Sequence, residues 1–276
     1  MPESVEYKIV PSSGRLFHWS ELWHYRELFY FFTWRDVKVK YKQTTLGVLW
    51  VVLQPVVQVL IFSVFFGRAL KVPSEGIPYP VFVFSGLLLW TFFSSSINNA
   101  GNSMLAHSAI IKKIYFPRLI IPISTVLASF LDLLVAFVIF VLTLIFYQVH
   151  ADFFKLIVFW PIALFFTLTG TLGISCWLAA LNVKYRDFRY VIPFALQLLL
   201  FLTPVIYPVS VINYLWLKYI LAFNPLSGAI ALFRMPLIPS QQPAEFIIIS
   251  LVSSILFLVL GIYYFKRTED FFADIA

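Results

Sequence analysis

The chain has 276 residues, of which 61% are hydrophobic, 19% aromatic and 12% charged, with a formal net charge of +7. Soluble domains are about 45 to 50% apolar and about a quarter charged, so this composition leaves too few charged residues for a water-exposed surface. It therefore excludes an ordinary soluble domain and indicates a protein whose solvent is largely lipid. The single cysteine, Cys176, excludes an intrachain disulfide.

The N-terminal segment, residues 1–45, is expected to be cytoplasmic. Residues 1–20 contain no apolar stretch of the kind that a cleaved signal peptide needs. Next, apolar side chains recur at helical spacing, which predicts an amphipathic helix: Leu22, Tyr25, Phe29 and Phe32. Its many aromatic residues favour a helix lying in the plane of the membrane surface. The alternative is a helix that packs on other parts of the protein.

Six stretches are long and apolar enough to cross a bilayer as helices, which takes about 20 residues. They cover roughly residues 46–67, 81–101, 119–147, 156–181, 191–209 and 246–265. Helices are expected because an open sheet would leave its edge unpaired in lipid. The sequence thus predicts an all-α membrane protein with a six-helix transmembrane domain over 46–265 and a cytoplasmic tail, 266–276.

Lysine and arginine gather on one side of these spans. Seven lie in residues 1–45, three in 102–118, three in 182–190 and two in the tail, against five between the other spans. The richer side faces the cytoplasm, so both termini are expected there, and positive loops beside anionic lipid need no nucleic-acid partner. Four cations before the first span are expected to anchor it at the membrane surface: Arg35, Lys38, Lys40 and Lys42.

Two spans carry rings and polar side chains at four-residue spacing, which places each set on one helix face. The first span has Trp50, Gln54 and Gln58, and the second has Trp90, Ser94 and Asn98. The fifth span adds Phe194 and Phe201. Such faces are typical either of a polar pathway or of helices joined by interhelical hydrogen bonds.

Residues 102–118, NSMLAHSAIIKKIYFPR, connect the second and third spans on the cytoplasmic side. Asn102 or Ser103 can cap a short helix here, and Pro117 prevents its smooth continuation into the third span. The alternative to such a helix is a solvated connecting loop.

Asp132 is the only formal charge that we find within a span, near the middle of the third. Charges inside a membrane are costly and usually functional, but the sequence shows no cation at matching depth. A protonated carboxyl, or one hydrogen-bonded to a neighbouring helix, is therefore expected. Further along, residues 210–245 hold two apolar pieces that are too short to cross, separated by Asn224 and Pro225.

Three motifs, RDVKVKYKQTTLGVLWVVLQP, IKKIYFPR and NVKYRDFRYVI, resemble the membrane subunits of polysaccharide and polyol-phosphate exporters, a branch of the ABC-2 transporter permeases. The resemblance implies a homodimer in the bacterial cytoplasmic membrane with two separate ATPase subunits. The implied cargo is a lipid-linked glycan such as O-antigen, capsule or teichoic acid polymer. It also implies re-entrant helices within 210–245 that close the outer mouth.

Within this resemblance, the cytoplasmic loop carries a coupling helix whose candidate ATPase contacts are His107, Ile110, Ile111, Lys112 and Lys113. The polar and aromatic faces become candidate walls of the glycan pathway. Rings stack on sugars, and amides exchange hydrogen bonds with sugar hydroxyls. The candidates are Trp50, Gln54, Gln58, Trp90, Ser94, Asn98, Phe194 and Phe201.

None of the ten glycines is followed by lysine, so the phosphate-binding motif G-x-x-x-x-G-K-[ST] is absent. ATP and Mg are therefore expected in the partner ATPase, with no cofactor and no catalytic site in this chain. A permease for a small lipid or drug is the alternative function. A secondary transporter should show internal repeats, and a membrane glycosyltransferase should show clustered carboxylates; neither feature is found.

Overall fold

The computed structural model describes residues 23–42, 47–238, 243–269 and 272, and within these ranges the ordered elements are helices. This confirms the predicted all-α fold. The elements are α2 (Arg26–Lys42), α3 (Gly47–Phe62), the π-helical η1 (Ser63–Ala69), α4 (Tyr79–Ala106), α5 (Ser108–Ile111), α6 (Ile120–Phe146), α7 (Phe153–Lys184), α8 (Phe188–Leu202), the 3-10 turn η2 (Val209–Val211), α9 (Leu215–Ala222), α10 (Pro225–Arg234) and α11 (Ala244–Thr268).

Among the described residues, five helices are long and apolar enough to cross a membrane, which confirms five of the six predicted spans. They are Leu49–Ala69, Tyr79–Ala106, Ile120–Phe146, Phe153–Lys184 and Ala244–Thr268. The remaining span, expected over 191–209, is shorter: α8 has 15 residues, or about 22 Å at 1.5 Å per residue. It ends because Thr203, which precedes Pro204, is extended.

Helices α9 and α10 form a pair bent by 97°. The bend lies at Asn224, whose side chain caps α10 by accepting a hydrogen bond from the Leu226 backbone N–H at 3.0 Å. Pro225 occupies the first helical position, which suits proline because no backbone donor is needed there. The predicted break at Asn224 and Pro225 is therefore confirmed. All ten residues of α10 are buried.

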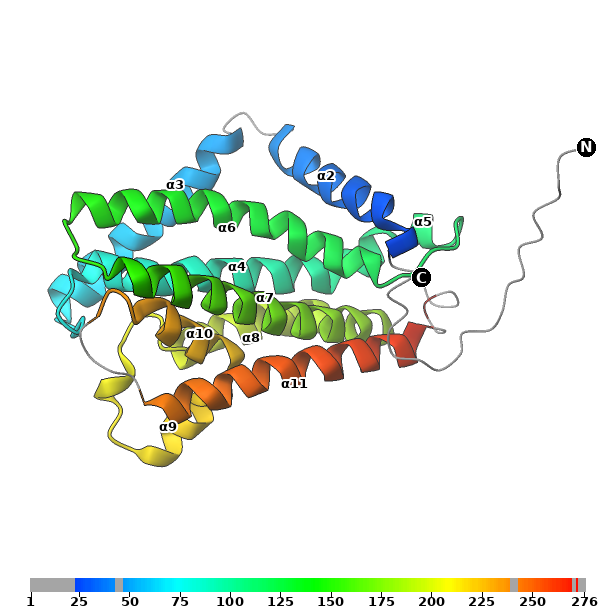
Figure 1. Ribbon diagram of the computed structural model, residues 1–276. Coiled ribbons are helices and arrows are strands. Elements are labelled where there is room, and N and C mark those ends of the chain that lie inside the picture. The colour runs from blue at the N-terminus through cyan, green and yellow to red at the C-terminus, as the bar shows by residue number, and fades with distance from the viewer. Residues whose placement is uncertain (1–22, 43–46, 239–242, 270–271, 273–276) are drawn as a thin grey trace, which may run out of the picture.

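The long helices run side by side, with α4 in the middle of the bundle, between α6 and α7, and α11 along α7 (Figure 1). One end of the bundle, which we call the α5 end, holds α5, the start of α2 and the end of α11. The opposite end, the α10 end, holds the α6–α7 connection and α10. The loop 102–118 and the chain after α11 meet at the α5 end, where the Arg118 backbone N–H donates to Glu269 Oε1 at 3.1 Å.

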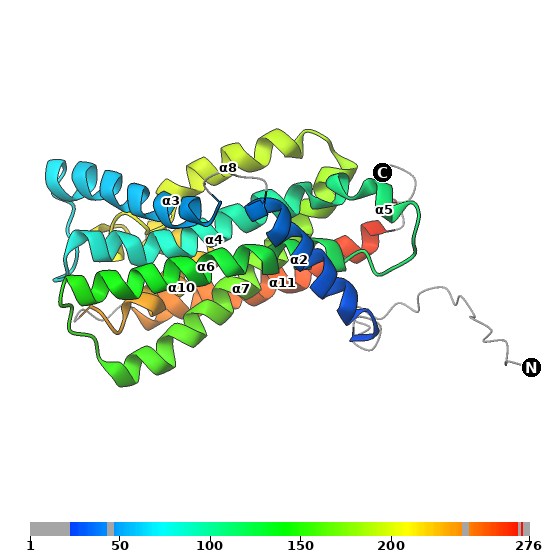
Figure 2. The ribbon, with the colours of Figure 1, turned by 90° about the horizontal axis from the view of Figure 1, so that it is seen from above.

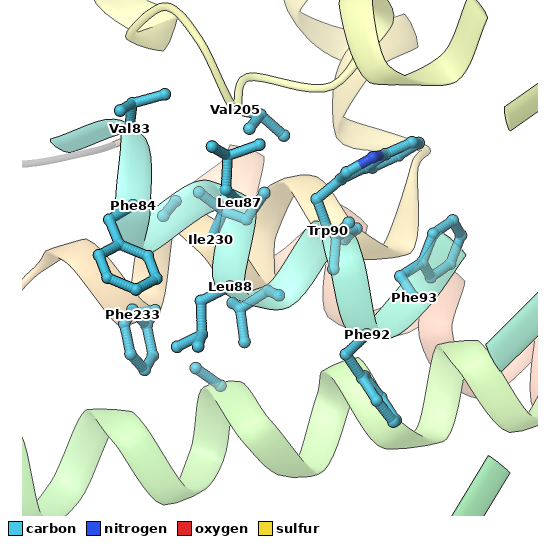
Figure 3. Close-up of a cluster of buried hydrophobic side chains, with 14 of the residues drawn as sticks. Val83, Phe84, Leu87, Leu88, Trp90, Phe92, Phe93, Val205, Ile230 and Phe233 are labelled. Carbon is cyan, nitrogen blue, oxygen red and sulfur yellow. The ribbon is translucent and has the colours of Figure 1, made fainter. Parts of the chain in front are cut away.

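The main core surrounds α4, which is apolar on nearly every side and is buried accordingly. Figure 3 shows Phe84 of α4 pointing toward Phe233 of α10. The Phe233 ring stacks on Trp160 of α7 with centroids 5.1 Å apart, and Phe140 of α6 joins the group. These rings tie four helices together near the α10 end.

Two glycines let α7 and α11 approach each other closely. A Cβ atom added to Gly261 would lie 2.0 Å from the Gly173 carbonyl oxygen, and one added to Gly173 would lie 2.4 Å from the Phe257 carbonyl oxygen. Neither position can hold a side chain without separating the helices. Small residues at such contacts are usual in membrane bundles, because backbone packing replaces the hydrophobic effect there.

Helix α2 lies over α6 (Figure 2). Phe32 is buried against the Phe116 ring, at 5.7 Å between centroids, whereas Tyr30, Phe31 and Trp34 are exposed on another face. The helix therefore packs on the protein along one side, as in the alternative considered above. Its exposed aromatic face is available to the membrane surface, as the first expectation requires. The predicted helical position Leu22 lies outside the described residues.

Candidate functional site

A cavity of about 710 Å³ with a mixed polar and apolar lining lies between α2, the second half of α4, α5 and the first half of α6. A smaller cavity of about 90 Å³ adjoins it, with Lys40 lining both, and extends to α3. The polar lining of the larger cavity includes Arg35, Asp36, Lys40, Asn98, Asn99, Asn102, Thr125 and Ser129. Amide and hydroxyl side chains make up most of these polar residues, and α2 supplies the charged ones.

The cavity lining follows from helical spacing. Asn98 and Asn102 are one turn apart on α4, and Thr125 and Ser129 are one turn apart on α6, so each pair shares a helix face. The Asn102 side chain donates to the Asn98 carbonyl at 2.8 Å, and the buried Asn182 of α7 donates to Asn102 Oδ1 at 3.2 Å. The Asn102 side chain is therefore held both by its own helix and by α7.

The same geometry corrects the predicted start of the coupling helix. Because α4 continues to Ala106, Asn102 and Ser103 lie inside it and do not cap a new helix. Ser103 donates to the Ala100 carbonyl of its own helix at 2.7 Å. The short helix α5 begins at Ser108, after His107, whose side chain makes no capping bond. It is only four residues long.

Asp132 has a cationic partner, so the expectation of none is wrong. Lys40 forms an ion pair with its carboxylate, and the Tyr41 hydroxyl donates to the same group. The hydrogen bond to a neighbouring helix is thus confirmed, but the carboxyl is paired with a cation and not isolated. The error arises because Lys40 precedes the first span in sequence, whereas α2 folds back along α6. Burial, followed by the bond to Asp132, raises the pKa of Tyr41, which keeps its hydroxyl a donor.

Arg35 joins α2 to the loop at the α5 end. Its guanidinium contacts His107 Nε2 and donates to Asp36 Oδ1 at 2.7 Å. Because a guanidinium only donates, Nε2 must accept, so Nδ1 carries the proton and donates to the Ser103 carbonyl at 2.6 Å. Burial lowers the pKa of His107, which agrees with this neutral tautomer. The imidazole therefore acts as an uncharged link between α2 and α4.

The four predicted anchor cations divide into two groups. Arg35 and Lys40 face the bundle and bind other side chains, as described above. Lys42 is exposed, and Lys38 is exposed with its ammonium 5.4 Å from the centroid of the Trp34 ring. Only the second group keeps the geometry expected of a surface anchor.

The predicted pathway residues of the first two spans do not form one surface. Trp50 and Gln54 line the smaller cavity, and Asn98 lines the larger one. Gln58 instead contacts α4, where its Oε1 accepts from Thr91 at 3.5 Å. These three cavity residues are therefore the part of the predicted pathway that the structure brings near α2.

The other pathway candidates lie elsewhere. Trp90 is only 7% exposed and packs against Phe93 in the main core (Figure 3), because the central helix α4 is enclosed on most sides. Ser94 donates to the Thr91 carbonyl of its own helix. Phe194 and Phe201 are exposed on the outside of α8. The expectation that Trp90 faces an open pathway is thus wrong for this conformation.

The predicted ATPase contacts also divide by burial. Lys112 and Lys113 are exposed and Ile110 is half-buried, but Ile111 is buried in a cluster with Phe32 and Phe116. Ile111 therefore holds the loop against α2 and cannot reach a partner. The sequence interpretation missed Ile114 and Tyr115, which are 61% and 78% exposed. Their signal was present: they begin a run of three large apolar residues between a lysine pair and a proline.

Metal binding has no candidate in the part of the chain that the structure describes. No group of three or more His, Cys, Asp or Glu residues there could hold an ion. The residues that line the two cavities offer hydrogen bonds, ion pairs and an aromatic ring.

The sequence of the chain is similar to those of known membrane transport proteins. The family profile described as ABC-2 type transporter matches residues 27–238. The O-antigen export system permease protein RfbA of Klebsiella pneumoniae is 31% identical over 87% of this chain and 92% of its own length. A Myxococcus xanthus protein of the same name is 28% identical over 91% and 96%. The polysialic acid transport protein KpsM of Escherichia coli is 26% identical over 74% and 79%. The chain therefore belongs to the ABC-2 type transporter family.

Proposed function

We propose that this chain is the membrane subunit of an exporter for a lipid-linked polysaccharide such as O-antigen. The observation that carries the proposal is similarity over nearly the whole chain to permeases named for O-antigen export, together with a further relative named for polysialic acid transport. The cavity supports it, because amide and hydroxyl groups are suited to hydrogen bonding with sugars. The chain would carry the substrate and catalyse no reaction itself.

Energy for export would come from a separate ATPase. The absent phosphate-binding motif supports this division of labour. The ATPase would dock at the α5 end, on Ile110, Lys112 and Lys113 together with the exposed Ile114 and Tyr115. Movement of this loop would reach α2 through the His107–Arg35 contact and α6 through the Lys40–Asp132 pair. ATP and Mg would be bound by the partner.

We further propose two copies of the chain and two ATPase subunits in the bacterial cytoplasmic membrane. The α5 end would face the cytoplasm together with both termini, because it carries the lysine- and arginine-rich loops. Helices α3 and α8 leave large apolar side chains exposed, among them Leu53, Leu60, Phe194 and Phe201. These faces are available to a second copy, which would place Trp50 and Gln54 near a shared pathway.

Deleting the gene and measuring polymer at the cell surface tests the proposal. We expect surface polymer to disappear while lipid-linked polymer accumulates inside the cell, and re-expression of the chain should restore it. A matched strain lacking a glycan synthesis enzyme would lack both pools. Normal surface polymer in the deletion strain, combined with new sensitivity to a small toxic compound, would instead support the small-substrate permease.

A further inference from the structure

Arg234, the last residue of α10, is only 4% exposed and is surrounded by oxygen acceptors. Its Nε donates to Ser85 Oγ at 3.0 Å, and its Nη1 donates to the Pro204 carbonyl at 2.8 Å. Its Nη2 donates to the carbonyls of Phe82 at 3.1 Å and Val205 at 2.7 Å. The guanidinium also lies 3.7 Å from the centroid of the Phe82 ring. All its nitrogen atoms are thus used.

This position changes how Arg234 counts among the charges of the chain. The sequence interpretation placed it among the five cations in the loops opposite the positive side. The structure places it inside the protein, so it does not belong among the loop cations that are counted to orient the chain in the membrane. A buried arginine is costly unless its donors are satisfied, so these contacts call for a functional explanation.

The acceptors of Arg234 come from segments that are far apart in sequence. Phe82 and Ser85 belong to the first turns of α4, whereas Pro204 and Val205 follow the end of α8. Among the backbone hydrogen bonds of the described residues, none ends on the Pro204 or Val205 carbonyl. Arg234 therefore supplies donors that the backbone does not, and joins α10, α4 and the segment 203–205.

Gly86 makes room for this arrangement. A Cβ atom added there would lie 2.7 Å from Arg234 Nη2, 2.9 Å from the Val205 carbonyl oxygen and 3.0 Å from the Val205 Cα. Even a methyl group would therefore displace the guanidinium or the segment. The absence of a side chain at 86 and the fork of Arg234 are two independent features that fit the same close approach.

Two neighbouring contacts hold the same segment. The Asn224 side chain, at the bend between α9 and α10, donates to Thr203 Oγ1 at 2.7 Å. The Tyr79 hydroxyl of α4 donates to the Ile206 carbonyl at 2.9 Å. The chain that leads from α8 into α9 is thus fastened on both sides of the two carbonyls that Arg234 binds.

We propose that Arg234 is a positioning residue of the α10 end, which fixes the segment 203–205, just after α8, against α4. Lysine cannot replace it, because one ammonium cannot reach acceptors that a planar fork reaches from three nitrogen atoms. Export depends on this position, because the polymer must leave past the end to which α8 and α9 lead. This last step rests on the proposed function, whereas the position itself does not.

Thiol labelling of the full chain in lipid nanodiscs tests the position. Cys176 is replaced by Ala, and the buried Val205 by Cys, as the reporter. In this background, Arg234→Lys should accelerate labelling by a water-soluble maleimide about tenfold, which corresponds to losing one net charged hydrogen bond. Arg68→Lys is the matched control, since Arg68 is an exposed cation at the same end, and it should change nothing. Ser210→Cys reports the rate of an exposed thiol.

If the Arg234→Lys protein does not accumulate in the membrane, a second variant tests the same position of the segment 203–205. Gly86→Ala keeps the charge and favours the α4 helix, yet should also accelerate labelling of the Val205→Cys thiol, because the added methyl group displaces the fork or the segment that it holds. Slow labelling in both variants would overturn the proposal. For the transport step, Arg234→Lys should lower surface polymer at an unchanged protein level and unchanged ATPase association. Fast labelling with normal surface polymer would overturn that step alone.

Discussion

Arg35 and Lys40 at the α5 end and Arg234 at the α10 end are held in opposite ways. At the α5 end, Arg35 and Lys40 have side chains that are 28% and 47% exposed, and both bind acidic partners. At the α10 end, Arg234 is buried and binds carbonyl and hydroxyl oxygens. Partly exposed ion pairs contribute about 0 to 1 kcal/mol. Leaving a buried charge without its partners costs roughly 3 to 5 kcal/mol. The contacts of Arg35 and Lys40 can therefore break and re-form at low cost, whereas those of Arg234 cannot.

The surrounding helices follow the same division. Helix α2 buries only Phe32, whereas all of α10 is enclosed by α4, α7 and α11. Under the proposed function, a transport cycle driven from the α5 end would move α2 without disturbing the core. By contrast, α10 can move only together with α4. This comparison predicts where substitutions will unfold the chain and where they will only uncouple it.

The largest effect should come from exchanging the arginine at each end for methionine. Arg234→Met leaves the Pro204 and Val205 carbonyls without their donor, and we expect a loss of roughly 2 to 6 kcal/mol, at about 1 to 3 kcal/mol for each unsatisfied buried acceptor. Arg35→Met should lower stability by only about 1 kcal/mol. Thermal unfolding in nanodiscs, alongside protein level in the membrane, measures both. Equal destabilisation by the two variants would contradict the comparison.

The division between the ends could be predicted from sequence only in part. Apolar length located five spans, and the lysine and arginine pattern grouped the loop 102–118 with the end of α11, which the Arg118–Glu269 contact joins. These features are local, so a single sequence reports them. The partner of Asp132 could not be found this way, because Lys40 lies 92 residues away and reaches it only after α2 folds back.

Burial within a helix was equally hidden. Trp90 and Trp50 follow similar four-residue patterns, yet the first is in the core and the second lines a cavity. Periodicity identifies a helix face but not which neighbour covers it. The same holds for Ile110 and Ile111, and for Arg234, which has the sequence context of a loop cation. In each case the local sequence pattern fits both a buried and an exposed position, and tertiary packing determines which one the residue takes.

Substitutions at Ile110 and Ile111 test whether all contacts at the α5 end contribute little to stability. Ile111→Asp places a carboxylate in the cluster around Phe32 and Phe116, where an unpaired polar group costs roughly 1 to 3 kcal/mol and a charge costs more. We expect a reduced protein level. Ile110→Asp should leave the level unchanged and weaken co-purification of the ATPase. If both variants accumulate normally, the cluster does not hold the loop.

A smaller effect is expected from pH, through the link between α2 and α4. Burial lowers the pKa of His107, so the folded chain binds fewer protons than the unfolded chain below about pH 6.5. Stability should therefore fall as the pH falls through this range, because a protonated imidazole would face the Arg35 guanidinium, with Asp36 opposing this only in part. Each unit of pKa difference is worth about 1.4 kcal/mol. His107→Gln, whose amide oxygen can accept from Arg35, should remove this dependence in unfolding measured at pH 5.5 and 7.5. An unchanged pH dependence in that variant would assign the effect to another group.

The smallest effect on stability should come from Trp50, which lies between the two ends on α3 and is 54% exposed beside the Lys40–Asp132 pair. Removing its ring opens no cavity in the core, so Trp50→Ala should unfold at nearly the same temperature as the parent. Loss of a stacking surface is worth on the order of 1 kcal/mol per contact, and two copies of the chain would each lose one. Surface polymer should therefore fall while protein level and ATPase association stay normal, and Trp50→Phe should restore most of it.

Trp90→Ala is the matched contrast. Removing its buried ring should lower stability by roughly 3 to 5 kcal/mol, as in soluble cores, and protein level should fall first. If Trp50→Ala exports normally, or loses polymer only in proportion to lost protein, then Trp50 is not part of the pathway.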